Sequence, residues 1–215
     1  MTHLQPPAGT RLIHPARGQV PRWGRLPDPA RGRGWFSTAP AGWVVVAGGL
    51  LFLLARPALG ASPVALPVLA VGYLVLLVVA LAVRADRDDP ARAPLGWRLP
   101  LLLGLVGVAG ASVVGGPVAD RRGGVVAAGL ALGAAVAEEA LFRRVLYDRL
   151  LRFGVVAAVI GSAGVFALVH LPAYGVAAMP VDLGAALLLS WQRYASGRWT
   201  VPAVTHAVAN LLAVT

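Results

Sequence analysis

Apolar runs separated by short arginine-bearing stretches occupy most of this chain of 215 residues. Hydrophobic residues make up 58% of the sequence and charged residues 13%, which is typical of polytopic membrane proteins and not of soluble domains. A backbone inside a bilayer has to satisfy its hydrogen bonds internally, so runs of this length predict spanning helices. The sequence therefore predicts an all-α transmembrane helix bundle of about seven spans, at residues 35–54, 64–83, 99–118, 125–146, 155–170, 176–191 and 201–215.

Residues 1–34 differ from the rest of the chain, since they are rich in proline and arginine and contain no apolar run. They lack both the early apolar segment of a cleavable signal peptide and the hydrophobic content of a folded unit. We expect a disordered basic cytoplasmic tail at 1–34, followed by a transmembrane helical domain at 35–215.

All 19 basic side chains are arginines, and their distribution predicts an orientation. With the tail inside and seven spans, 16 of them fall on inner segments and only Arg56, Arg121 and Arg122 on outer ones. Cytoplasmic loops carry such an excess, so the N-terminus is predicted to be cytoplasmic. The arginine-only composition, with its many alanines and glycines, indicates a GC-rich bacterial genome and hence the bacterial cytoplasmic membrane.

The net charge of +10 does not indicate a nucleic-acid partner, because the arginines are spread over the stretches between apolar runs. Membrane lipids with anionic headgroups are the partners that fit this pattern. The chain has no cysteine, which excludes disulfides and thiolate metal sites.

The two glutamates of the chain, Glu138 and Glu139, are adjacent and lie inside the apolar run at 125–146. A charged side chain in hydrocarbon costs at least ~2.5–3.5 kcal/mol, so two carboxylates in one span indicate a function. On a helix, Glu139 and Arg143 lie four residues apart on one face, where they can form an ion pair. Glu138 is turned ~100° from that face and can point into a cavity.

Two of the four histidines also lie in apolar runs. Phe166 precedes His170 by one helical turn, and His206 precedes Asn210, the single asparagine of the chain, by the same interval. A carboxylate, two imidazoles and a carboxamide are the groups needed to activate water and to stabilise an oxyanion.

A count along the chain relates the first two clusters. Taking Gly154 as the apex of a helical hairpin, Glu138 and His170 are both 16 residues away, which predicts a common depth, ~24 Å along each helix. His206 does not fit this estimate. Its run begins on the same side of the membrane as the hairpin apex, and His206 is only about five residues from that start, so it is predicted to lie at a different depth from Glu138 and His170.

Each cluster also has a purely structural interpretation. The glutamates beside an arginine are consistent with a buried ion-pair network or with a proton relay. His170 precedes a Leu-Pro pair and is consistent with a helix end at the membrane interface. His206 and Asn210 are consistent with hydrogen bonding between helices.

The three motifs EExxxR, FxxxH and HxxxN, in this order on successive apolar runs, resemble those of the CPBP family. This family comprises the CAAX-protease and bacteriocin-processing intramembrane endopeptidases and is also called the Abi family. The resemblance covers residues 125–213, and the first half of the chain carries no family signal. Arg144 departs from the glycine that often follows the first motif.

The resemblance implies an α-helical membrane bundle with a water-filled polar cavity and an endopeptidase activity within the membrane. It assigns Glu138 as the base that activates water, His170 as the group that holds or polarises this water, and His206 with Asn210 as the oxyanion hole. Glu139, Arg143 and Phe166 would be supporting residues.

The resemblance also bears on the substrate, which would be a peptide or a membrane-associated protein. Eukaryotic members of the family release the last three residues of prenylated CAAX proteins, whereas many bacterial members are linked to bacteriocin maturation or immunity. In a bacterial protein a prenylated substrate is unexpected.

A metal is not required by these residues. Glu138, His170 and His206 form a conceivable zinc set. The HExxH signature of helical zinc proteases is absent, however, and a glutamate-activated water needs no metal. We therefore predict catalysis without a cofactor and keep zinc as the alternative.

Two other classes of function are consistent with the sequence. A non-proteolytic membrane binding or immunity protein on the same fold would hold a lipid or peptide without cutting it, and its function would survive the loss of Glu138. A transporter gains no support, because the chain shows no internal repeat.

Overall fold

The structure, a computed structural model, describes residues 39–83, 93–114 and 124–214. Every regular element in these ranges is a helix, which confirms the all-α class. The predicted tail at 1–34 lies outside the described residues. The elements in chain order are α1 (Ala39–Gly60), α2 (Ala65–Ala82), α3 (Arg98–Val114), α4 (Val125–Glu139), the π-helical segment η3 (Ala140–Leu146), α5 (Tyr147–Leu151), α6 (Val155–Tyr174), the 3-10 segment η4 (Val176–Ala178), α7 (Met179–Ser196) and α8 (Thr200–Val214).

Each of the seven predicted spans contains a helix. Among the described residues, four helical segments are long and apolar enough to cross a membrane: Pro40–Gly60, Ala65–Ala82, Val125–Leu151 and Val155–Tyr174. The helices α3 and α8 are also apolar but shorter. The protein is therefore a multi-pass membrane protein.

Four of the predicted spans end too early, at residues 54, 146, 170 and 191, and two of these ends lie close to the glutamate pair or to His170. The first helix continues past residue 54 to Gly60, so Arg56 belongs to α1 and not to an outer loop. The α6 helix continues past His170 and through Pro172, and ends at Gly175, whose φ is 77°. A proline removes one backbone hydrogen bond, which a membrane helix tolerates in its last turn, whereas a glycine with positive φ is a common helix stop.

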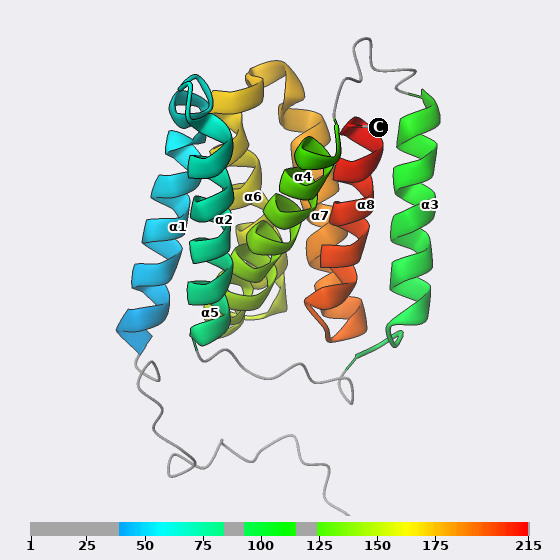
Figure 1. Ribbon diagram of the computed structural model, residues 1–215. Coiled ribbons are helices and arrows are strands. Elements are labelled where there is room, and N and C mark those ends of the chain that lie inside the picture. The colour runs from blue at the N-terminus through cyan, green and yellow to red at the C-terminus, as the bar shows by residue number, and fades with distance from the viewer. Residues whose placement is uncertain (1–38, 84–92, 115–123, 215) are drawn as a thin grey trace, which may run out of the picture. The chain divides into compact units, whose positions relative to one another are not determined.

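The helices around the glutamate pair come from both halves of the chain. The α4 helix packs against α2 and α8, α6 packs against α1 and α7, and α3 packs against α7 and α8 at one edge of the bundle (Figure 1). The continuous segment α4–η3–α5 runs obliquely across the bundle (Figure 1). Its oblique course brings the middle of this segment close to helices on either side.

A π-helical turn interrupts this oblique segment directly after the glutamate pair, over Ala140–Leu146. Such turns are uncommon and often lie at functional sites. Two arginines bond to the backbone around it: Arg193 Nε donates to the carbonyl of Arg143 (3.0 Å), and Arg144 donates to the carbonyls of Val83 (3.0 Å) and Ala80 at the end of α2. Carbonyl groups that the helices leave without a helical partner thus bond to guanidinium groups.

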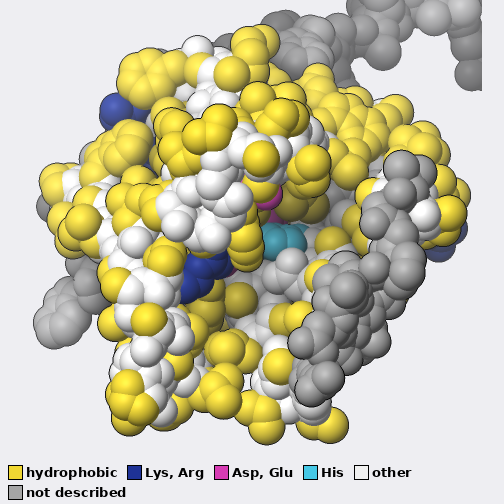
Figure 2. Space-filling model, turned by 90° about the horizontal axis from the view of Figure 1, so that it is seen from above, with side chains coloured by type: hydrophobic (Ala, Val, Ile, Leu, Met, Phe, Trp, Pro, Cys, Tyr) yellow, Lys and Arg dark blue, Asp and Glu magenta, His cyan; other side chains and the backbone are white. Residues whose placement is uncertain are grey.

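The charged side chains around the glutamate pair are inside this bundle, and many aliphatic side chains are outside. Glu138, Glu139, Arg143 and Arg193 are buried, whereas many valines and leucines of α1, α2 and α3 are exposed. This arrangement is expected for helices that face lipid and keep their ionisable groups toward the bundle interior. Seen from above, a histidine and acidic side chains are visible between hydrophobic ones (Figure 2).

Candidate functional site

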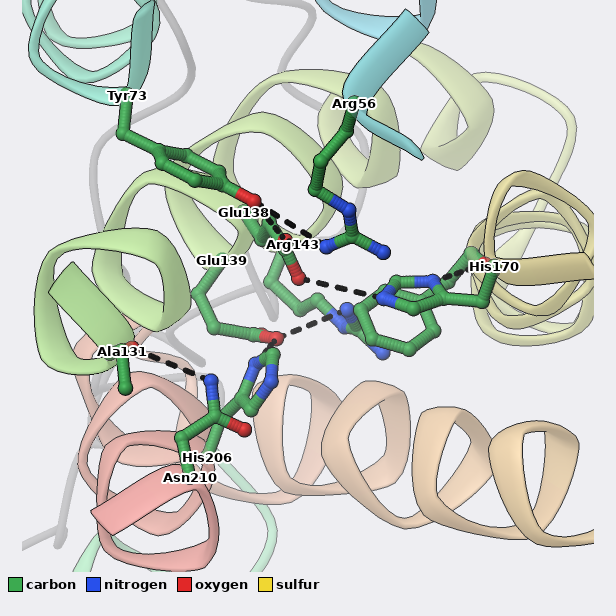
Figure 3. A network of polar contacts seen from close by, with 10 residues as sticks. Arg56, Tyr73, Ala131, Glu138, Glu139, Arg143, His170, His206 and Asn210 are labelled. Atoms are coloured by element: carbon green, nitrogen blue, oxygen red, sulfur yellow. Dashed lines mark hydrogen bonds and ion pairs between the residues drawn. The ribbon is translucent and has the colours of Figure 1, made fainter. Parts of the chain in front are cut away.

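Three segments bring the seven predicted residues together in the bundle interior (Figure 3). The glutamates end α4 and Arg143 follows in η3, α6 carries the FxxxH motif, and α8 carries the HxxxN motif. The exposed fraction is 0% for Glu139 and Arg143, 2% for Glu138, 5% for His170 and 8% for His206. Charged groups buried to this extent are almost always paired, so their partners define the site.

The two oxygens of Glu138 have different surroundings. Its Oε1 accepts hydrogen bonds from Arg56 Nη1 (3.1 Å) and from the Tyr73 hydroxyl (3.3 Å). Its Oε2 faces Nε2 of His170 at 3.6 Å. This last distance is too long for a hydrogen bond. One oxygen is thus held by two donors, and the other faces an imidazole across a short gap.

The tautomer of His170 follows from its contacts. Its Nδ1 lies 2.8 Å from the carbonyl oxygen of Phe166. A carbonyl can only accept, so Nδ1 carries the proton, and Nε2 of the neutral ring is an acceptor. The ring stacks on Phe166 with 4.2 Å between the centroids and on Tyr174 with 5.6 Å. The imidazole is therefore fixed in place, with its basic nitrogen toward Glu138.

Glu139 is bound by two partners through one oxygen. Its Oε1 accepts from Arg143 Nη1 (3.0 Å), which confirms the ion pair predicted from the spacing. The same oxygen lies 2.8 Å from Nδ1 of His206, a contact that the sequence did not predict. Arg143 also donates to the Ala186 carbonyl (3.0 Å) and lies over the ring of Phe166 (4.6 Å). Arg143 therefore ties η3 to α6 and α7.

His206 and Asn210 share one face of α8 but bond to different partners (Figure 3). Nδ2 of Asn210 donates to the backbone carbonyl of Ala131 in α4 (3.2 Å), whereas His206 bonds to Glu139. The ring of His206 also meets the edge of Phe166, with 5.7 Å between centroids. Both imidazoles thus contact the same phenyl ring.

The depth estimate from the sequence holds for one pair and needs correction for the other. Glu138 and His170 meet at 3.6 Å, as the equal counts from Gly154 predicted. His206 contacts Glu139 although the count placed them at different depths. The count assumed straight helices parallel to the membrane normal, whereas α4–η3–α5 crosses the bundle obliquely (Figure 1).

Sequence reasoning missed two residues of the site, Arg56 and Tyr73. Arg56 was assigned to an outer loop because its run appeared to end at residue 54, and Tyr73 was not singled out within its apolar run. A charged side chain within one turn of an apolar run, and a tyrosine in the middle of another, were the signals that could have found them.

The donor set does not match a metal site. Among residues 39–83, 93–114 and 124–214, no three His, Cys, Asp or Glu side chains are grouped so as to hold a metal ion. Of the conceivable zinc set, Glu138 is bonded to Arg56 and His206 to Glu139.

Comparison with known proteins identifies the C-terminal part of the chain. Residues 121–212 match the family described as "Type II CAAX prenyl endopeptidase Rce1-like". No curated protein and no solved structure matches the chain. The matched range contains all seven predicted site residues and excludes Arg56 and Tyr73. Residues 121–212 thus form an Rce1-like domain of the type II CAAX prenyl endopeptidases, which is consistent with the resemblance to the CPBP family.

Proposed function

We propose that this protein is an intramembrane endopeptidase in which Glu138 and His170 activate a water molecule. The observation that carries the proposal is the 3.6 Å gap between Glu138 Oε2 and His170 Nε2, both buried within helices of an Rce1-like domain. A carboxylate oxygen and an imidazole nitrogen with its lone pair free are two acceptors that converge on one point. A water molecule bonded to both would have its oxygen directed at a substrate carbonyl.

The chemistry follows from these two acceptors. Glu138 takes a proton from the water molecule while the water oxygen forms a bond to the carbonyl carbon of the scissile peptide. The proton then passes from Glu138 to the peptide nitrogen as the C–N bond breaks, which yields a carboxylic acid and an amine. His170 keeps the water in place, since its Nδ1 proton is bound to Phe166 and its Nε2 accepts.

The tetrahedral intermediate needs donors for its oxyanion, and α8 supplies two candidates. Asn210 uses one hydrogen of its amide for Ala131 and has a second hydrogen to donate. His206 bonds to Glu139 through Nδ1, so its Nε2 donates only when the ring is the imidazolium. The bond to Nδ1 fixes the orientation of the His206 ring, which gives Glu139 a role in the proposal beside its ion pair with Arg143.

Glu138→Gln tests the proposal, because it keeps the size of the side chain and removes the base. The protein would be reconstituted in liposomes and given fluorescent peptides, some S-farnesylated and some with an apolar spanning segment, with products identified by mass spectrometry. We expect cleavage by the wild-type protein and a loss of about 100- to 10,000-fold in the variant.

The matched control is Asp182→Asn in α7, which makes the same carboxylate-to-amide change at a residue that has no hydrogen bond or ion pair to another side chain among the described residues. It should cleave as the wild type does. Cleavage by Glu138→Gln at the wild-type rate would refute Glu138 as the base. Binding of a peptide that is never cut, with equal affinity in both proteins, would instead support a non-proteolytic binding protein.

A further inference from the structure

Two residues outside the Rce1-like domain hold one oxygen of the proposed base. We infer that Arg56 of α1 and Tyr73 of α2 are positioning residues, which hold Oε1 of Glu138 so that Oε2 is the oxygen that faces His170 and takes the proton. The inference rests on the proposed function, because it concerns the same carboxylate. It extends the site into the half of the chain that carries no family signal.

The contacts form a closed group of three side chains (Figure 3). Arg56 Nη1 donates to Glu138 Oε1 (3.1 Å) and to the Tyr73 hydroxyl oxygen (3.2 Å), and the Tyr73 hydroxyl donates to the same Oε1 (3.3 Å). The exposed fraction of the side chain is 15% for Arg56 and 2% for Glu138. Hydrogen bonds to a charged group in such a low-dielectric interior are stronger than the same bonds in water.

The charge of Arg56 bears on whether Glu138 can act as a base. A carboxylate in a membrane interior favours its neutral form unless a cation or several donors stabilise its charge. The groups that face Glu138 are Arg56 from α1, Tyr73 from α2 and His170 from α6. On its own segment, Arg143 is bonded to Glu139 and to the Ala186 carbonyl. Arg56 is therefore the cation that bonds directly to the Glu138 carboxyl group.

The placement of both donors on one oxygen also fixes the orientation of the carboxyl group. With Oε1 held from α1 and α2, Oε2 points toward α6, where His170 lies (Figure 3). Without these donors the carboxyl group is free to rotate, and a displacement of the base by about 1 Å can cost about 100-fold in rate. The arrangement thus serves catalysis and not only helix packing.

The test compares Arg56→Gln, Arg56→Lys and Tyr73→Phe on whichever farnesylated or membrane-spanning peptide the wild-type protein cleaves. We expect kcat to fall about 100-fold in Arg56→Gln with KM unchanged. Tyr73→Phe, which removes one hydrogen bond to a charged group, should lower kcat about tenfold. Arg56→Lys keeps the cation and should recover part of the loss.

Two controls match these changes. Arg98→Gln removes an exposed arginine at the start of α3, and Tyr147→Phe removes the hydroxyl of a buried tyrosine in α5. Both should keep the wild-type kcat. Because Arg56 and Tyr73 act through the same oxygen, the double variant Arg56→Gln/Tyr73→Phe should lose less than the product of the two single losses.

The outcomes separate this inference from the proposed function. A wild-type protein that cleaves, with kcat unchanged or raised in Arg56→Gln and Tyr73→Phe, would overturn the inference alone. A lower thermal unfolding temperature with an unchanged kcat for the folded protein would also overturn it, since it would show a structural role. A wild-type protein that cleaves none of the peptides would count against the proposed function and, with it, the inference.

Discussion

At the scale of single residues, the structure separates two side chains that the sequence had paired. His206 and Asn210 lie one turn apart on α8, yet His206 bonds to Glu139 and Asn210 bonds to the backbone of α4 at Ala131. Asn210 therefore has two candidate roles, a link between α4 and α8 and a donor to an oxyanion. The two roles predict different measurements.

Removal of the Asn210 amide tests the oxyanion role. In Asn210→Ala we expect transition-state stabilisation to fall by about 2.7–4 kcal/mol, the cost of losing one oxyanion donor, with little change in KM. Steady-state kinetics in liposomes measure this loss. Ser162→Ala is the control, because it breaks another bond between helices, to Ser190 (3.1 Å), outside the site. A variant with normal kcat and a lower unfolding temperature would leave Asn210 only its linking role.

At the scale of the elements, the segment α4–η3–α5 contains a π-helical turn and the buried charged side chains of Glu138, Glu139 and Arg143, all of which are costly inside a membrane. Arg143 is fully buried and bonds to both Glu139 and α7, while its own carbonyl accepts from Arg193. Arg193 also reaches Asp148 of α5 (3.3 Å). The π-helical turn is thus held on both sides by guanidinium groups, which explains how an irregular turn persists inside a membrane helix.

Loss of Arg143 should therefore harm folding before it harms chemistry. Arg143→Ala leaves the Glu139 carboxylate buried without its cation, and we expect a loss of about 3–5 kcal/mol in stability. Thermal unfolding of the purified protein in detergent measures the effect. Arg152→Ala, which removes an exposed arginine at the end of α5, should change little. An Arg143→Ala protein as stable as the wild type would contradict the structural role.

At the scale of the whole molecule, the arginines still predict the orientation of the bundle, although fewer of them lie in loops than the sequence indicated. Arg143 and Arg193 were assigned to inner segments but are buried in the bundle, so they are not loop charges. The end of the bundle where α5 meets α6 still carries Arg149 and Arg152, and it is the end from which α1 starts. The positive-inside rule predicts that this end is cytoplasmic.

The orientation can be measured directly because the chain has no cysteine. Single cysteines would be introduced as Ala61→Cys, between α1 and α2, and as Phe153→Cys, between α5 and α6. With a membrane-impermeant maleimide on intact cells, we expect labelling at 61, and at 153 only after lysis. The opposite labelling pattern would show that the bundle has the reverse orientation in the membrane. The expected pattern would place the end of the bundle from which the histidine is visible on the outer side (Figure 2).

The sequence by itself determined the class of the molecule, the positions of its helices and most of its candidate site. Length and hydropathy act locally along the chain, so the helices of the described residues and the ion pair between Glu139 and Arg143 could be predicted from runs and spacings. Equal residue counts on the two arms of a hairpin sufficed to bring Glu138 and His170 together.

Only the tertiary structure decided which helices supply the partners of the two carboxylates. The bond from His206 to Glu139, and those from Arg56 and Tyr73 to Glu138, depend on how far each helix is tilted and rotated against its neighbours. The apolar faces of membrane helices resemble one another, so hydropathy carries little information about tilt or rotation. Packing and hydrogen bonds between helices, made after the spans have formed, settle these contacts.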